Sequence, residues 1–163
     1  METTVDKTLL LEFFLVFSRF EYALKASGLF KRHPPDPPRL PKAEPDWDTF
    51  AVSLRDTFDP NATRELREAC LYLQESPPNQ QVIIGDGVAW ETPVRPVRDT
   101  EIEFLLRMVR CVRNNLFHGG KYNIAMHEDT QRTEMLLRSS LVILDACLNL
   151  SPKQLAAYRE ARL

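Results

Sequence analysis

We predict that the 163-residue chain folds as one all-α domain covering residues 1–163. Apolar residues recur by threes and fours in segment 99–118, while segments 9–26 and 129–148 are long apolar stretches bounded by helix-capping residues. The length is sufficient to bury a single core without cross-links or metal. A helical bundle is therefore the expected architecture.

The first predicted helix begins after a cap at Thr3 or Thr4 and ends at Ser27 and Gly28. Its apolar residues cover most of the circumference, because Phe13, Phe14, Phe17 and Phe20 all occur in it. A helix with one wet face does not need this pattern. We expect neighbouring helices or a second subunit to enclose it.

A proline-rich connector, residues 34–45, holds half of the twelve prolines. Proline prevents a helix from continuing and stiffens an extended chain. We expect a spacer laid across the surface, and the alternative is a ligand for a proline-recognition domain.

The middle of the chain is predicted to form short helices that pack against the core and a hairpin or loop. Helical spacing covers 46–58, and a second short helix follows Asp59 and Pro60. Residues 80–97 are predicted to form a hairpin or loop insertion, because apolar triplets flank Gly85-Asp86-Gly87.

The second half of the chain is predicted to form two long helices and a short terminal one. Asp99 or Thr100 caps the first, which ends at Gly119-Gly120. The second covers roughly 129–148, and the terminal helix starts at Ser151.

Composition narrows the environment and the cofactors. The net charge is -2, so any RNA contact must be local rather than spread over the surface. Three scattered cysteines among apolar residues suit reduced thiols and a cytoplasmic location. With only three histidines and no close cysteine pair, we expect no metal and no cofactor. The three cysteines are Cys70, Cys111 and Cys147.

The apolar run 9–17 is too short to span a membrane.

The predicted helix from Asp99 carries the residues suited to chemistry. On a helical wheel Arg113 lies at the edge of the core face, and an adjoining polar face holds Arg107, Arg110, Asn114 and His118. A fixed guanidinium can grip two phosphate oxygens. Histidine can take and return a proton near neutral pH.

The segment RNNLFHGGKY, residues 113–122, resembles the signature of HEPN domains: an Arg, a polar residue directly after it, and a His a few residues on. A long first helix, a motif helix and a long closing apolar helix extend the resemblance. It implies a HEPN-like helical bundle, a homodimer in which two motif helices meet, and metal-independent RNA cleavage that leaves a cyclic phosphate.

The resemblance also assigns roles to residues. Arg113 would clamp the scissile phosphate, His118 would act as general acid or base, and Asn114 would orient one of them. Nearby cations offer further RNA contacts, since no Asp or Glu occurs between Glu103 and Glu128. These RNA-binding candidates are Arg107, Arg110 and Lys121.

Two further residues are hypotheses. Glu21 is a candidate for holding Arg113 in place, although an ordinary helical ion pair with Lys25 is the slightly favoured explanation. Tyr122 is a candidate modification site, because some toxins of this family are silenced by a minimal nucleotidyltransferase antitoxin that adds AMP to a tyrosine. Here the tyrosine follows His118 by four positions rather than two.

The expected function is therefore a metal-independent endoribonuclease acting by 2'-hydroxyl transesterification, as a toxin or antiviral defence effector. The first alternative is a non-catalytic protein of the same fold that binds RNA or nucleotides or serves in an assembly. The second is a purely structural helical adaptor.

Overall fold

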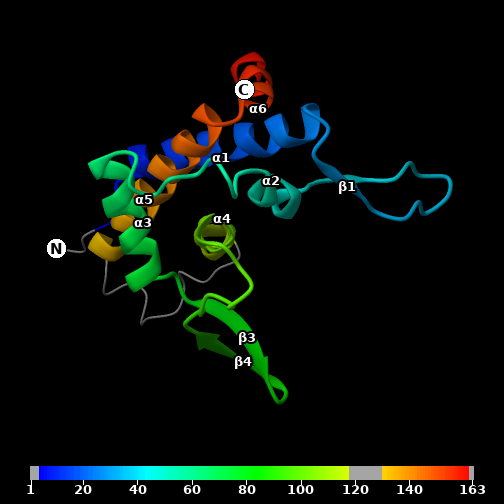
Figure 1. The fold of residues 1–163 in the computed structure, drawn as a ribbon. Coiled ribbons are helices and arrows are strands. Elements are labelled where there is room, and N and C mark those ends of the chain that lie inside the picture. Colours follow the sequence, from blue (N-terminus) through cyan, green and yellow to red (C-terminus); the bar gives the residue numbers. More distant parts are fainter. Residues whose placement is uncertain (1–3, 118–129, 162–163) are drawn as a thin grey trace.

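The computed structural model describes residues 4–117 and 130–161, and this part of the chain is mostly helical. It contains six helices and two separate two-stranded antiparallel sheets (Figure 1). The prediction of an all-α domain with one hairpin or loop insertion is therefore confirmed only in part, because the described residues form two antiparallel strand pairs and only one of them was anticipated.

Helix α1 spans Lys7–Ala26. Its N-cap is Asp6, whose side chain accepts a hydrogen bond of 2.8 Å from the backbone N–H of Thr8, so the predicted cap at Thr3 or Thr4 is wrong. The C-terminal end matches the prediction: Ser27 is the C-cap, and Gly28 follows with a φ of 91°, a conformation that favours glycine.

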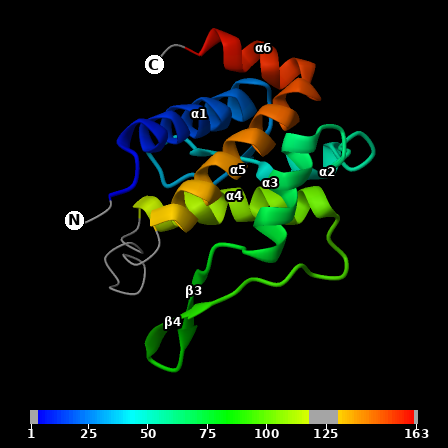
Figure 2. The same ribbon diagram turned by 90° about the vertical axis from the view of Figure 1, so that its left-hand side faces the viewer.

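One side of α1 is enclosed. Helices α5, Thr130–Asn149, and α6, Pro152–Glu160, pack against it (Figure 2). Three of its phenylalanines, Phe13, Phe17 and Phe20, are buried, but Phe14 remains 43% exposed. Among the described residues, the expectation of an enclosed helix is thus met on one side of α1.

The proline-rich connector does not lie across the surface as predicted. Strand β1, Phe30–Arg32, which precedes the connector, pairs antiparallel with β2, Ala43–Pro45, which forms its last three residues. Residues 30–45, called the arm below, project away from the helices (Figure 1).

The next elements carry local signals for their ends. Helix α2, Trp47–Ser53, stops at Leu54 and is shorter than the predicted 46–58, because turns replace the helix after that residue. Helix α3 covers Arg64–Glu75. Strands β3, Gln80–Ile84, and β4, Gly87–Glu91, form the predicted hairpin.

Helix α4, Glu101–Phe117, contacts α2, α3 and α5. A capping box starts it: the backbone N–H of Thr100 donates to the Glu103 carboxylate at 2.8 Å, and the Thr100 hydroxyl donates at 2.6 Å. Arg55, from the segment after α2, also binds Glu103 at 2.7 Å. The predicted helix end at Gly119-Gly120 lies outside the described residues.

Helix α5 matches the predicted 129–148 closely, and α6 begins after Ser151 as expected. Across the described ranges, no single helix is long and apolar enough to cross a membrane, and only α5 and α6 taken together, bent by 113°, have the length and composition.

Glu103→Gln should lower the free energy of unfolding by about 1 kcal/mol at neutral pH. Hydrogen bonds from Arg55 and then Thr100 hold the pKa of Glu103 down to about 2 from 4.5. The charged form therefore stabilises the fold above pH about 4.5, and this contribution is lost as the pH falls through about 2. Urea denaturation of both proteins from pH 7 to pH 2 measures the difference, and a pH-independent difference would contradict the role of the charge.

Candidate functional site

Arg113 lies on the last part of α4, supported by aromatic rings. Its guanidinium carbon lies 5.1 Å from the centre of the Phe117 ring and 5.9 Å from that of Phe17. The Phe117 ring in turn contacts Phe14 of α1, with ring centres 5.5 Å apart. Stacking on aromatic faces restrains a guanidinium while leaving its charge in place.

Arg113 has no carboxylate within ion-pair distance among the described residues. Its Nη1 donates a hydrogen bond of 3.2 Å to the Oδ1 atom of Asn114. An amide oxygen orients the guanidinium but does not neutralise it. The side chain is therefore a partly buried, oriented cation with unused donors, which is the arrangement needed to bind a phosphate oxygen.

The two other predicted RNA-binding arginines of α4 differ from Arg113. Arg107 pairs with Asp99 at the start of the helix, and Arg110 Nη1 lies 3.6 Å from Asp48 Oδ1 of α2. The local excess of cations noted along the sequence is thus partly neutralised by acids brought in from elsewhere. Both arginines stay partly exposed, so they can still contact a ligand at their free edges.

A groove of about 510 Å³ separates α4 from β3. Asn115 of the motif fastens its wall, since its Nδ2 donates a hydrogen bond of 2.7 Å to the backbone oxygen of Asn79. Sequence reasoning assigned no role to either asparagine. Amide and guanidinium groups dominate the lining, which suits a polar ligand such as a nucleotide. The lining residues are Gln80, Gln81, Arg107, Arg110, Cys111, Asn114 and Asn115.

A second, apolar groove of about 350 Å³ lies beside the motif, between the start of α1 and the end of α4. Leu11 and Phe117 are 57% and 48% exposed there. Exposed apolar area of this kind is typical of a surface that another molecule covers. Its lining comprises Leu10, Leu11, Phe13, Phe14, Leu116 and Phe117.

Glu21, the candidate for orienting Arg113, has another partner. Its Oε1 atom accepts a hydrogen bond of 3.2 Å from the indole nitrogen of Trp47. No ion pair joins Glu21 to Arg113 or to Lys25 in the described part of the chain. The carboxylate instead anchors the tryptophan that packs against the aromatic residues of α1.

Three predicted site residues, His118, Lys121 and Tyr122, lie outside the described residues. The structure therefore brings Arg113 and Asn114 into contact and places Arg107 and Arg110 along the same helix, and the roles of the other three remain predictions.

The cysteines do not supply a ready nucleophile. Burial raises the pKa of Cys70 to about 12 and that of Cys111 to about 11, and it raises the pKa of Cys147 as well. All three thiols are free and stay protonated at neutral pH. Within residues 4–117 and 130–161, no group of three or more His, Cys, Asp or Glu side chains is arranged to hold a metal ion.

Arg113→Ala should change the free energy of unfolding by about 1 kcal/mol or less, because only two cation–π contacts and one hydrogen bond to the exposed Asn114 are lost. Arg107→Ala should cost more, about 1–3 kcal/mol, because it leaves the Asp99 carboxylate poorly paired. The Asp99 side chain is 8% exposed, and without Arg107 its one remaining ion-pair partner among the described residues would be Arg98, 3.9 Å away. Urea denaturation at pH 7 ranks the two variants. A larger loss for Arg113→Ala would mean that this arginine serves the fold.

No protein-family model matches the chain, and neither a curated protein nor a solved structure resembles it significantly. Function must therefore be inferred from the geometry of α4 and from the pattern of residues 113–122.

Proposed function

We propose that the chain is a metal-independent endoribonuclease with a HEPN-like fold. The observation that carries the proposal is the state of Arg113, which is restrained by two phenylalanine rings and paired with no described carboxylate. Arg107 and Arg110 each lie within ion-pair distance of a carboxylate, whereas Arg113 does not among the described residues. Its guanidinium donors can therefore bind a phosphate oxygen.

The proposed reaction is transesterification within RNA. The ribose 2'-oxygen attacks the adjacent phosphorus and the bond to the 5'-oxygen breaks, which yields a 2',3'-cyclic phosphate and a free 5'-hydroxyl. Arg113 stabilises the negative charge that builds up on the phosphorane oxygens. His118 accepts the 2'-hydroxyl proton or supplies one to the leaving oxygen, a role that follows from the resemblance. Asn114 keeps the guanidinium oriented.

RNA enters this proposal through the groove beside α4. Its amides and the exposed edges of Arg107 and Arg110 can bind the nucleotides that flank the scissile bond. Lys121 adds a further cation next to the motif in sequence. DNA is not a substrate for this reaction, because it lacks the attacking 2'-hydroxyl.

A homodimer completes the proposed site. The apolar groove beside the motif leaves Leu11, Phe14 and Phe117 partly exposed, and a second copy can cover it. Two motif helices would then share one cleft, as the HEPN resemblance implies.

The biological setting is inferred from the resemblance alone. It suggests a cytoplasmic toxin or antiviral effector that cleaves cellular or invading RNA. A minimal nucleotidyltransferase antitoxin that modifies Tyr122 is the partner that this resemblance offers, although the spacing from His118 departs from the pattern.

Purified protein should cleave single-stranded RNA in the presence of EDTA. Arg113→Ala and His118→Ala should each lower the maximal rate by at least about 100-fold, because both remove transition-state interactions. Arg110→Ala should mainly raise KM. Gel analysis with mapping of the product ends measures both effects, and Arg64→Ala on α3 is the matched surface control.

Two results would contradict the enzyme. RNA that is shifted but never cut would favour the non-catalytic RNA-binding alternative. Near-normal turnover by folded His118→Ala would remove the histidine from the mechanism.

Light scattering should give the mass of a dimer at micromolar concentrations, and Phe117→Lys should shift the protein toward monomer. The reason is that a charge in the apolar groove must be desolvated when a second copy covers it. Leu40→Lys, on the arm and 87% exposed, is the matched control and should leave the mass unchanged. A wild-type monomer at high micromolar concentration would contradict the shared cleft.

A further inference from the structure

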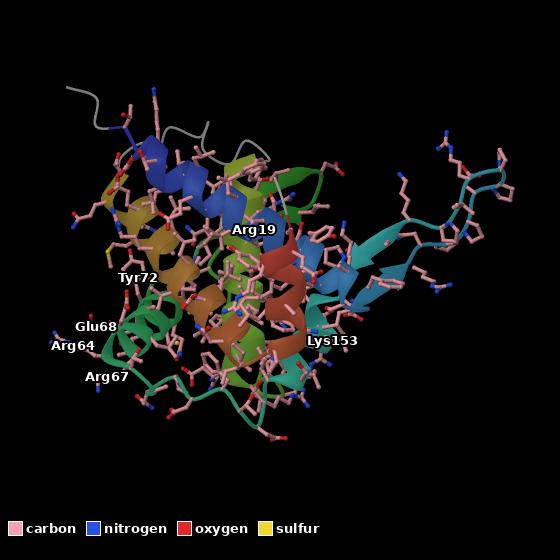
Figure 3. All side chains as sticks on the ribbon, turned by 90° about the horizontal axis from the view of Figure 1, so that it is seen from above. Arg19, Arg64, Arg67, Glu68, Tyr72 and Lys153 are labelled. Carbon is pink, nitrogen blue, oxygen red and sulfur yellow. The ribbon has the colours of Figure 1, made fainter. Side chains whose placement is uncertain are left out.

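The arm, residues 30–45, carries a local excess of positive charge. Between Lys31 and Lys42 there are four Lys or Arg residues and a single acid, Asp36, although the whole chain has a net charge of -2. Every residue from 30 to 44 is exposed. The arm is therefore a solvated, basic projection on a nearly neutral protein (Figure 3).

Two of the arm's charged groups are already paired. Lys31 Nζ lies 2.9 Å from Asp48 Oδ2, and His33 Nε2 lies 2.7 Å from Glu44 Oε2. Three cations have no carboxylate partner among the described residues. These three unpaired cations are Arg32, Arg39 and Lys42.

The arm is also preorganised. Five prolines between residues 34 and 41 each fix a backbone φ angle. Backbone hydrogen bonds close its loop, from His33 to Lys42 at 3.0 Å and from Arg39 to Asp36 at 2.8 Å. A stiff element loses little conformational entropy when it binds a partner.

The base of the arm adjoins the polar face of α4. Asp48 binds Lys31 of the arm through one carboxylate oxygen and lies 3.6 Å from Arg110 of α4 through the other. Phe17 links the same regions, since its ring lies 5.3 Å from the Trp47 ring and 5.9 Å from the Arg113 guanidinium. Positive groups thus follow one another from Arg113 through Arg110 to the arm.

We propose that the arm binds the sugar–phosphate backbone of the RNA that occupies the α4 site, through Arg32, Arg39 and Lys42. This inference rests on the proposed function, because it extends the same RNA path beyond the groove. A stiff, solvated row of cations contacts phosphates without reading bases. The arm therefore raises affinity for single-stranded RNA of any sequence and leaves the chemical step unchanged.

The test compares two triple variants that each remove three positive charges. The arm variant is Arg32→Ala, Arg39→Ala, Lys42→Ala. The control variant is Arg64→Ala, Arg67→Ala, Lys153→Ala, on α3 and α6, outside the arm (Figure 3). The probe is a fluorescein-labelled single-stranded 2'-O-methyl RNA, which lacks the free 2'-hydroxyl needed for cleavage, and anisotropy gives Kd at several salt concentrations.

The arm variant should raise Kd by about tenfold or more at moderate salt. It should also reduce the slope of log Kd against log salt by roughly 2, since each phosphate contact with a single strand contributes about 0.7. The control variant should bind as the wild type does. A charge-retaining arm variant, Arg32→Lys, Arg39→Lys, Lys42→Arg, should keep the wild-type affinity and slope.

The proposal is overturned if the arm and control variants weaken RNA binding equally, or if the arm variant does not weaken RNA binding at all. In the second case, an acidic protein is the partner that fits the arm. Failure of the proposed function is a separate result. If the wild type binds the probe through the arm but never cuts RNA, this inference holds and the proposed nuclease activity is wrong. If the wild type cuts RNA and the arm variant binds the probe as tightly as the wild type does, the nuclease proposal holds and this inference is wrong.

Discussion

The stacking of Trp47, the first residue of α2, on phenylalanine rings of α1 holds together the part of the molecule on which the candidate site depends. The indole packs against Phe20 with ring centres 5.0 Å apart and against Phe17 at 5.3 Å, and its N–H donates to Glu21. This cluster attaches α2 to α1. Because Phe17 also lies under Arg113, the position of the motif arginine follows from the packing of this core.

Charge pairing separates the arginines of α4 into two kinds. Arg107 and Arg110 contact Asp99 and Asp48, acids that precede α4 or lie on α2, and so contribute to joining elements. Arg113 contacts rings and an amide instead. The ion pairs of Arg107 and Arg110 reduce the positive field along most of the helix, so we expect an anion to bind mainly at the motif and at the arm.

The end of α1, the start of α4 and the β3–β4 hairpin could be predicted because their signals are local: Gly28 after α1, Thr100 with Glu103 before α4, and Gly85 with a φ of 60° in the turn. The start of α1 and the end of α2 were predicted wrongly. The pairing of β1 with β2 could not, since three-residue strands leave no alternating pattern and their base is held by a hydrogen bond from Asp46 to Leu29. The same holds for the candidate site. A helical wheel placed Arg113 at the edge of the core face and Asn114 on the adjoining polar face with Arg107 and Arg110, but the partners of these two arginines depend on tertiary contacts that no wheel contains.

We propose that the Arg113 guanidinium, which has no carboxylate partner among the described residues, is an oriented phosphate ligand. Side-chain ¹⁵N NMR tests it directly, with the Arg113 Nε–H signal identified by its loss in Arg113→Lys. Titration with a single-stranded 2'-O-methyl RNA should shift this signal as the complex forms and leave the signal of Arg64, which pairs with Glu68, in place. An Arg113 signal that stays unchanged while the RNA binds would contradict the account.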